Sequence, residues 1–375
     1  MRAWVEENLC PYVDEWDEAH SCPIEKLRKS AAEAGVLCPW APVEMGGTPP
    51  GEGWDYFMFV IWADELARCG AGGVSVLFFI TYMSLPHIIH FGSDYLKETI
   101  GRRVARGECG MAITLTEPQG GSDLANIKTT ATKTADGKHY IINGVKKFIT
   151  GGQCVEYFNT LVRTGKAAHG GLSMVIIPAN AKGVTVTKLE AAGWWAGNTT
   201  LVKFEDVQVP VEMLIGQEGK GFEVMATVMN GERLIGCLGP LRSARMLLEE
   251  SIKFARERKT FGQRLSDSQV IRHKFAQMAR RCEAAQGIVE GIAYSMKCGA
   301  GAKEIGGPMA LAKVEAGSAL EYCAREASQI LGGASFLRQG KGQLVERLAR
   351  EVRVSIVGGG SEEIMLDLAM RMSKV

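Results

Sequence analysis

Hydrophobic and polar positions along the first part of this 375-residue chain repeat with the period of a helix. In "PIEKLRKSAAEAGVL" and "SDYLKETIGRRVARGE" apolar residues recur every three to four positions, which places them on one helical face. Ser93 stands where an N-cap is expected, and Gly70 stands where the apolar segment "EGWDYFMFVIWADELARCG" would end. The pattern predicts an N-terminal helical domain over residues 1–110.

From about residue 111 the pattern changes to short, β-branched runs separated by Gly, Asn and Pro. These runs are "HYIINGVKKFIT", "NTLVRT", "LSMVIIP", "GVTVTKL" and "TLVKFEDVQVP". Asp136 and Gly137, in "TADGKHYIING", are typical of a hairpin turn. The pattern predicts a small, mostly antiparallel β domain over residues 111–217.

The rest of the chain, residues 218–375, has helical periodicity again. One of its long segments, "PMALAKVEAGSALEYCAREASQILGG", ends at Gly332 and Gly333, which predicts a C-terminal cap there. The predicted fold class is therefore α+β and mainly α, with the order helices, β domain, helices.

Composition and charge narrow the class of protein. Hydrophobic residues make up 46% and charged residues 23% of the chain, as in ordinary globular proteins. The net charge of +1 gives no electrostatic signal for nucleic acid or an anionic membrane. The longest apolar runs are short or interrupted for a bilayer span. Ten scattered cysteines without a CxxC pair indicate reduced thiols in an intracellular protein, and no metal site is expected.

Motifs for several common chemistries are missing from the sequence. His87 and His90 have no HExxH context, so they are interpreted as structural residues. There is no GxSxG nucleophile elbow, no P-loop, and no GxGxxG after a strand. If a nucleotide binds, another architecture must hold it.

Glu232, in "NGERLIG", is a candidate base. On a helix its neighbours three and four positions away are Val228, Met229, Ile235 and Gly236, which form an apolar, small-residue face. A carboxylate on such a face is costly unless it is paired or its pKa rises. An ion pair with an arginine of another helix and a catalytic role both stay open on these grounds.

Three other stretches could carry chemistry. The loop "LTEPQGGSD" would present backbone amides and hydroxyls to a planar polar ligand, or be a turn-rich junction. The run "RERKTFGQRL" would contact a diphosphate, or be a solvated helix end. In "IVGGGSEEI", Glu362 and Glu363 are candidate acid/base carboxylates.

Together these motifs resemble those of the acyl-CoA dehydrogenase family along nearly the whole chain. The motifs are "MAITLTEPQGGSD", "INGVKKFITGG", "FEDVQVP", "ERKTFGQ", "QILGG" and "IVGGGSEEIM". The resemblance implies an N-terminal helical domain, a middle β-barrel-like domain and a C-terminal four-helix bundle.

The resemblance also implies tightly bound FAD. The residues expected to contact it are Ile113, Leu115, Thr116, Ser122, Phe148, Thr150, Arg258, Thr260, Phe261, Gln269, Gln329, Gly332, Gly333, Ser361 and Glu363. Phe148 stands where the family has tryptophan. Because contacts to the diphosphate and adenosine cross between subunits in the family, a homodimer or homotetramer is implied.

The implied reaction is α,β-dehydrogenation of an acyl-CoA thioester to the trans-2-enoyl-CoA. A carboxylate takes the α proton, hydride passes to flavin N5, and electrons leave to an electron-transfer flavoprotein. Many relatives keep the base at the position of Gly359, which has no carboxylate here. The "GERL" sequence matches the branch, including isovaleryl- and long-chain-type enzymes, in which Glu232 would be the base.

Other roles follow from the same resemblance. The backbone N–H of Gly359 would hold the thioester oxygen, and Ser122, Asn230 and Arg233 are assigned to the substrate. Alternatives are an acyl-CoA oxidase using O₂, a desaturase of an unusual or carrier-bound acyl group, and a non-dehydrogenating, DNA-associated relative. The length of the acyl chain and the compartment (cytoplasm, mitochondrial matrix or peroxisome) stay open.

Overall fold

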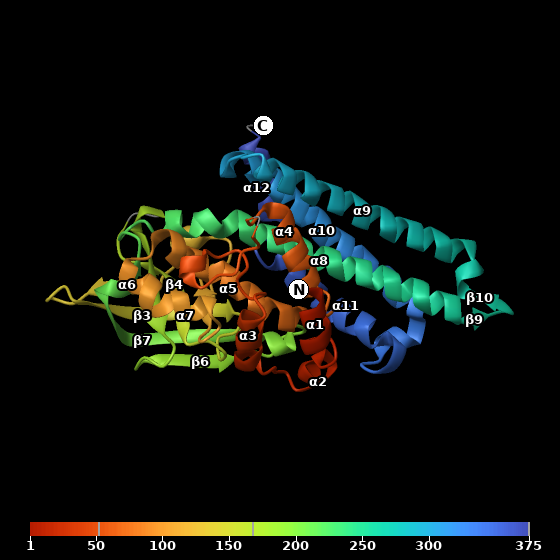
Figure 1. The fold of residues 1–375 in the computed structure, drawn as a ribbon, viewed down its shortest axis with the longest axis horizontal. Helices are drawn as coiled ribbons and strands as arrows, with labels where there is room; N and C mark the ends of the chain where they lie inside the picture. The colour runs from red at the N-terminus through yellow and green to blue at the C-terminus, as the bar shows by residue number, and fades with distance from the viewer. Residues whose placement is uncertain (52, 167–168, 374–375) are drawn as a thin grey trace. The chain divides into compact units, whose positions relative to one another are not determined.

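A computed structural model describes residues 1–51, 53–166 and 169–373. The chain forms helices, then an eight-stranded sheet, then long helices, which confirms the predicted fold class (Figure 1). It divides into two compact units. The helical unit contains residues 1–13, 55–72 and 232–375, and the sheet unit contains residues 14–54 and 73–231. The predicted limits of the three domains stay predictions.

The sheet follows the alternating pattern of the sequence. Its strands are β1 (Met111–Thr114), β2 (Thr130–Lys133), β3 (His139–Ile149), β4 (Tyr157–Arg163), β5 (Leu172–Pro178), β6 (Val184–Lys188), β7 (Thr200–Pro210) and β8 (Leu214–Ile215). Their order is β6-β7-β3-β2-β4-β5-β8, with β1 beside β4. Most pairs are antiparallel, but β1 and β2 pair with β4 in parallel.

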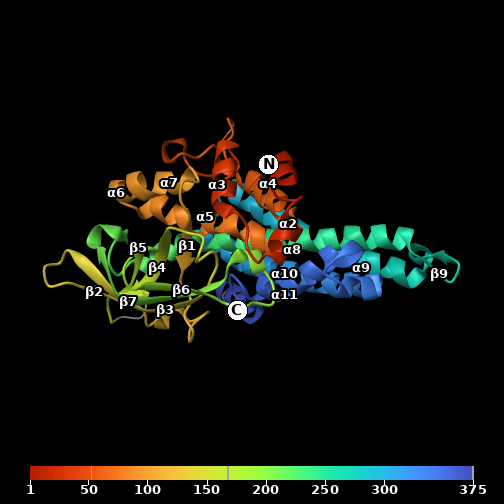
Figure 2. The same cartoon turned by 90° about the horizontal axis from the view of Figure 1, so that it is seen from below.

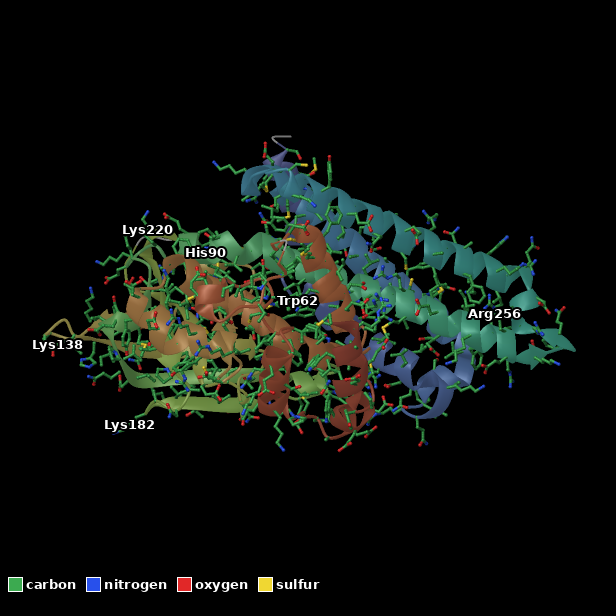
Figure 3. The ribbon with its side chains drawn as sticks, in the orientation of Figure 1. Trp62, His90, Lys138, Lys182, Lys220 and Arg256 are labelled. Atoms are coloured by element: carbon green, nitrogen blue, oxygen red, sulfur yellow. The ribbon has the colours of Figure 1, made fainter. Side chains whose placement is uncertain are left out.

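The predicted hairpin joins β2 to β3. Gly137 has the positive φ of 69° that such a turn requires, and Asp136 accepts a hydrogen bond from the Lys138 amide. Lys138 lies at the outer end of this turn (Figure 3). The turn therefore helps to fix the register in which β2 pairs with β3.

Helices cover one face of the sheet (Figure 2). The sheet unit contains α2 (Val13–Glu18), α3 (Ile24–Glu33), most of α5 (Gly72–Phe91), α6 (Asp94–Leu96), a π-turn (Lys97–Gly101) and α7 (Arg102–Ala105). The Ser84 hydroxyl of α5 donates to the Met111 carbonyl of β1, and Asn159 of β4 donates to the Ser84 carbonyl. The predicted cap at Ser93 is confirmed, since its side chain accepts from the Leu96 amide.

Helix α5 is a long apolar helix that continues through Pro86 to Phe91. It is the one helix of the described residues whose length and composition would suit a membrane span, so the expectation that the longest apolar runs are short or interrupted for such a span was wrong for this run. However, 72% of its most apolar window is buried inside the protein, as in the core helix of a folded unit. This helix is therefore weak evidence for a membrane.

The helical unit is built from long helices and a few shorter ones. They are α1 (Arg2–Asn8), α4 (Tyr56–Ala67), α8 (Gly221–Glu257), α9 (Gln269–Lys297), α10 (Ala302–Leu331), α11 (Gln343–Val357) and α12 (Glu362–Met372), and α8 begins in the sheet unit. A short hairpin of β9 (Lys259–Thr260) and β10 (Gln263–Arg264) joins α8 to α9. Helices α9 and α10 lie side by side (Figure 1).

The core of the helical unit is apolar and includes two thiols. Leu241, Ala285, Leu320 and Leu348 are among its buried members. The predicted stops are confirmed at Gly70, with φ of 69°, and at Gly332, the C-cap of α10 with φ of 59°. All ten cysteines are free.

Candidate active site

The loop over residues 115–123 leaves strand β1 and is tied to the end of strand β3. The carbonyl of Thr116 accepts from the Lys147 amide at 2.9 Å, and the Thr116 hydroxyl donates to the Lys147 carbonyl at 2.5 Å. Ile113 belongs to β1, and Leu115 directly precedes Thr116. These bonds join the loop to the segment that contains Phe148 and Thr150. The two segments have to lie together if both are to contact one flavin ring.

A buried ion pair connects this loop to strand β3. Lys146 Nζ is 3.0 Å from Glu117 Oε1 and also donates to the Leu115 carbonyl at 2.9 Å. Glu117 in turn accepts from the amides of Lys128 at 2.7 Å and Thr129 at 2.9 Å. The pair therefore ties Leu115, at the start of the loop, to Lys128 and Thr129, which lie just before β2.

Burial and the opposite charge of the partner are the main influences on the pKa values of Lys146 and Glu117. Burial lowers the pKa of Lys146 to about 8, although the Glu117 carboxylate acts in the opposite direction. Burial alone would raise the pKa of Glu117, but the Lys146 cation and the bonds from Thr129 and Lys128 bring it down to about 2. Glu117 is therefore an anion that is fixed in place and does not act as a proton acceptor near neutral pH.

Phe148 is displayed on the surface by a distortion of β3. Its φ is 66°, and the pairing of β3 with β7 shifts register between Lys147 and Ile149. The ring is 61% exposed, with the Lys147 ammonium 5.0 Å from its centroid. An unusual backbone conformation that exposes a large apolar ring suggests a ligand for that ring.

Glu232 lies on α8 with an apolar sequence context, as predicted. Its Oε1 is buried and has no hydrogen-bond partner in the described part of the chain. Burial raises the pKa of Glu232 to about 7, against a smaller opposing effect of the adjacent Arg233 cation. Burial also lowers the pKa of Arg233. Asn230 lies less than one turn earlier on the same helix.

The glycine loop, defined as residues 358–360, links α11 to α12. Gly359 has φ of 69°, and an added Cβ there would meet open space. Among the described residues its backbone N–H has no hydrogen-bond acceptor. The N–H is therefore available to a ligand.

Ser361 is the N-cap residue of α12, and Glu362 and Glu363 form the first turn of that helix. The pKa of Glu363 is lowered by its own backbone amide and by the Ser361 hydroxyl. Acidic residues are favoured at a helix N-terminus. Their position in the first turn of α12 therefore accounts for the two glutamates without a role in proton abstraction.

The residues expected at the diphosphate and adenosine gather at one end of the helical unit. Lys274 of α9 pairs with Glu326 of α10, and this antiparallel register brings Gln269 to the level of Gln329. The same end holds the exposed Gly332 and Gly333, Arg258, Thr260, and Phe261 at the tip of the hairpin. The Phe261 ring is fully exposed.

These groups fit the FAD that the motifs imply. In the sheet unit an exposed aromatic ring stands beside an anchored polar loop, which suits a planar heterocycle with polar edges. In the helical unit an exposed guanidinium and an exposed ring share one hairpin, which suits a diphosphate and an aromatic base. No group of three or more His, Cys, Asp or Glu in the described ranges is arranged to hold a metal ion.

Sequence reasoning missed the Lys146–Glu117 pair and a second buried lysine, Lys313, whose contacts are given below. The sequence does contain a signal for Lys146, because Tyr140, Ile142 and Lys146 are all at even-numbered positions of β3, which face inward there. For Lys313 the signal is a single cation within the apolar face of α10.

The fold and these sites define a flavoprotein oxidoreductase of the acyl-CoA dehydrogenase type. Models of the acyl-CoA dehydrogenase N-terminal, middle and C-terminal domains match residues 1–108, 112–207 and 219–373. The chain belongs to the acyl-CoA dehydrogenase family. It is thereby an FAD-dependent oxidoreductase that acts on acyl-CoA, which confirms the predicted family, enzyme class and cofactor.

Individual relatives agree with this assignment. The chain is 37% identical to acyl-CoA dehydrogenase apdG of Emericella nidulans, over 99% of this chain and 88% of that protein. A putative acyl-CoA dehydrogenase of Mycobacterium smegmatis has the same fold, with a TM-score of 0.94 and 33% identity over 100% and 95% of the two chains. An acyl-CoA dehydrogenase of Bacillus anthracis complexed with FAD gives a TM-score of 0.91 and 26% identity over 100% and 65%.

Proposed function

We propose that this protein dehydrogenates an acyl-CoA thioester to the trans-2-enoyl-CoA, with Glu232 as the base that takes the α proton. The observation that carries the proposal is the buried Oε1 of Glu232, which has no hydrogen-bond partner among the described residues. A folded protein rarely leaves a buried carboxylate oxygen unsatisfied without a reason. A proton acceptor aimed at a substrate supplies such a reason.

The raised pKa of Glu232 suits this role. A carboxylate with an ordinary pKa is a weak base for a carbon acid, whereas a pKa of about 7 makes Glu232 a stronger base that is still ionised in part at neutral pH. Polarisation of the thioester carbonyl by a fixed donor would lower the pKa of the α proton from the other side. The Gly359 N–H, which has no acceptor in the part of the chain that is described, is the donor that we assign.

Bound FAD would supply the acceptor for the β hydride. We propose that the sheet unit holds the flavin ring between the anchored loop residues Leu115 and Thr116 and the exposed ring of Phe148, with Ser122 and Thr150 at its polar edge. We assign the diphosphate and adenosine to the exposed end of the helical unit, around Arg258.

The exposure of this end supports an oligomer. Phe261 is fully exposed and Val270 is 65% exposed, although large apolar side chains of a monomer are mostly buried. Burial against a second subunit, with FAD contacts shared between subunits, would account for both. We propose a homodimer, or a homotetramer made of two dimers.

An electron-transfer flavoprotein is proposed as the electron acceptor, as the family resemblance implies. Direct reoxidation by O₂ would instead make the protein an acyl-CoA oxidase. Steady release of hydrogen peroxide with substrate, without an added acceptor, distinguishes the second case from the first.

The experiment is an anaerobic titration of the purified flavoprotein with butyryl-CoA, isovaleryl-CoA and palmitoyl-CoA, in which bleaching of the flavin is followed. The wild type is expected to bleach with at least one of them, and Glu232→Gln is expected to keep its flavin and fold but to lose bleaching. Glu249→Gln, an exposed glutamate on the same helix, is the matched control. Bleaching of Glu232→Gln at a rate near that of the wild type would refute the assignment of the base.

A further inference from the structure

Lys313 is a buried cation in the helical unit for which the proposed chemistry has so far given no role. It lies on α10 and is only 2% exposed. Its ammonium donates to the carbonyl of Ile356, in the last turn of α11, and to the carbonyl of Gly360 at 2.6 Å. Lys313 therefore contacts the last turn of α11 and the last residue of the glycine loop.

Burial of this ammonium has to be compensated. Isolated buried ammonium groups are strongly unfavourable, and within the described residues Lys313 forms no ion pair with a carboxylate. Burial lowers the pKa of Lys313, as expected for a cation out of water. The compensation comes from two backbone carbonyls and from the charge of the Glu362 carboxylate at the start of α12, so the position and charge of this side chain are tied to the path of the loop.

The two carbonyls have different local roles. The Ile356 carbonyl is one of the last four carbonyls of α11. These carbonyls accept no hydrogen bond from an N–H of the same helix, and they form its negative end. The Gly360 carbonyl belongs to the peptide that leads into the first turn of α12. Between them stands Gly359, with a left-handed backbone and no side chain to hold it by packing. Without another anchor such a segment would sample many conformations.

We propose that Lys313 is a positioning residue for the reaction: it fixes the chain on both sides of Gly359, so that the Gly359 N–H is held ready for the thioester oxygen. The cation also offsets the negative end of α11 next to the place where the thioester oxygen would gain negative charge. This inference rests on the proposed function, because it gives a purpose to the donor assigned there. Lys313 itself is not assigned a contact with the substrate.

The test compares Lys313→Met with Lys303→Met. Methionine keeps the apolar length of the side chain and removes the ammonium, and Lys303 is an exposed lysine of the same helix. Hydrogen–deuterium exchange of the peptide spanning residues 357–361 is measured in both holoenzymes, together with flavin content and thermal stability. The limiting rate of flavin bleaching and the acyl-CoA concentration for half-maximal rate are measured with the best of the three acyl-CoAs.

We expect faster exchange in this peptide for Lys313→Met only. The limiting rate of bleaching should fall roughly tenfold to a hundredfold, because a misplaced donor loses part of its stabilisation of the developing charge. The half-saturating concentration should change less, and flavin content should stay unchanged. A purely structural role would lower the melting temperature without this separation between rate and half-saturation.

Exchange and bleaching of folded Lys313→Met that equal those of the wild type would overturn the inference. If Lys313→Met does not fold, Lys313→Arg provides the same measurements with a cation of different reach, and unchanged loop exchange and rate in that variant would overturn it equally. A wild type that bleaches with none of the acyl-CoAs would refute the proposed function instead, so the two failures can be distinguished.

Discussion

The ammonium of Lys146 lies 3.0 Å from the carboxylate of Glu117, and both side chains are buried. Lys146 comes from β3, and Glu117 belongs to the loop. Bonds from Lys146 to Leu115, and from Lys128 and Thr129 to Glu117, extend the contact on both sides. This ion pair and the bonds between Thr116 and Lys147 thus hold a loop that contains two adjacent glycines, Gly120 and Gly121.

Removing the cation of this pair should destabilise the protein. Lys146→Met leaves Glu117 as a buried anion without a counter-ion, and breaking a buried pair in this way costs about 3–5 kcal/mol. Urea denaturation measures the loss, and flavin content reports whether the loop still binds FAD. Lys147→Met is the control for the denaturation measurement, since its ammonium stands over the Phe148 ring and takes no part in the pair. Equal losses in both variants would contradict this account.

The same pair should make the stability of the protein depend on pH in the acid range. The pKa of Glu117 falls to about 2 on folding from an ordinary value near 4.5, so the unfolded chain binds more protons between these two values. Stability from Glu117 is therefore fully present above about pH 4.5 and is lost as the pH falls toward 2. Free energies of unfolding between these limits should depend less on pH in Glu117→Gln than in the wild type. An unchanged slope in the variant would show that Glu117 has no such shift.

The raised pKa of Glu232 predicts the opposite dependence of stability on pH. Its pKa rises to about 7 on folding, so the folded protein binds the extra proton, and stability from this group falls as the pH rises from about 4.5 to 7. Glu232→Gln should therefore be more stable than the wild type above pH 7, by about 1–3 kcal/mol. Denaturation of the apoprotein at acid and at alkaline pH measures this difference.

Activity should follow the ionisation of the same group. In the wild type kcat/KM should rise with pH and level off above about 7, because only ionised Glu232 accepts the α proton. An acid limb near pH 4 would instead indicate an ordinary exposed carboxylate as the base.

The sequence predicted elements more fully than site geometry, for physical reasons. Periodicity places strands and helices, and it placed Glu232 on an apolar helical face. The exposure of Phe148 was not predictable in the same way, because a second register shift after Lys147 reverses the alternation of β3. The role of Lys313 was also out of reach, since its contact with Ile356 and Gly360 joins positions that only tertiary packing brings together.

A carboxylate at the glycine loop should partly replace Glu232. An added Cβ at Gly359 meets open space, so Gly359→Glu can be accommodated, although its φ of 69° costs about 1–2 kcal/mol for a residue with a side chain. In a Glu232→Gly background, Gly359→Glu is expected to recover part of the bleaching by acyl-CoA. Gly359→Gln in the same background is the control and should recover none. Equal rates in the two double variants would argue against a proton acceptor at this position.

Phe148 allows strain and ligand binding to be separated. Its φ of 66° disfavours any residue with a side chain, so Phe148→Gly should relieve about 1 kcal/mol of backbone strain in the apoprotein. The same change removes the 61% exposed ring that we place against the flavin, so FAD affinity should fall. Phe148→Trp keeps an aromatic surface and should retain the cofactor. Denaturation of the apoproteins and fluorescence titration with FAD measure the two effects. Tighter FAD binding by Phe148→Gly would show that the exposed ring has another purpose.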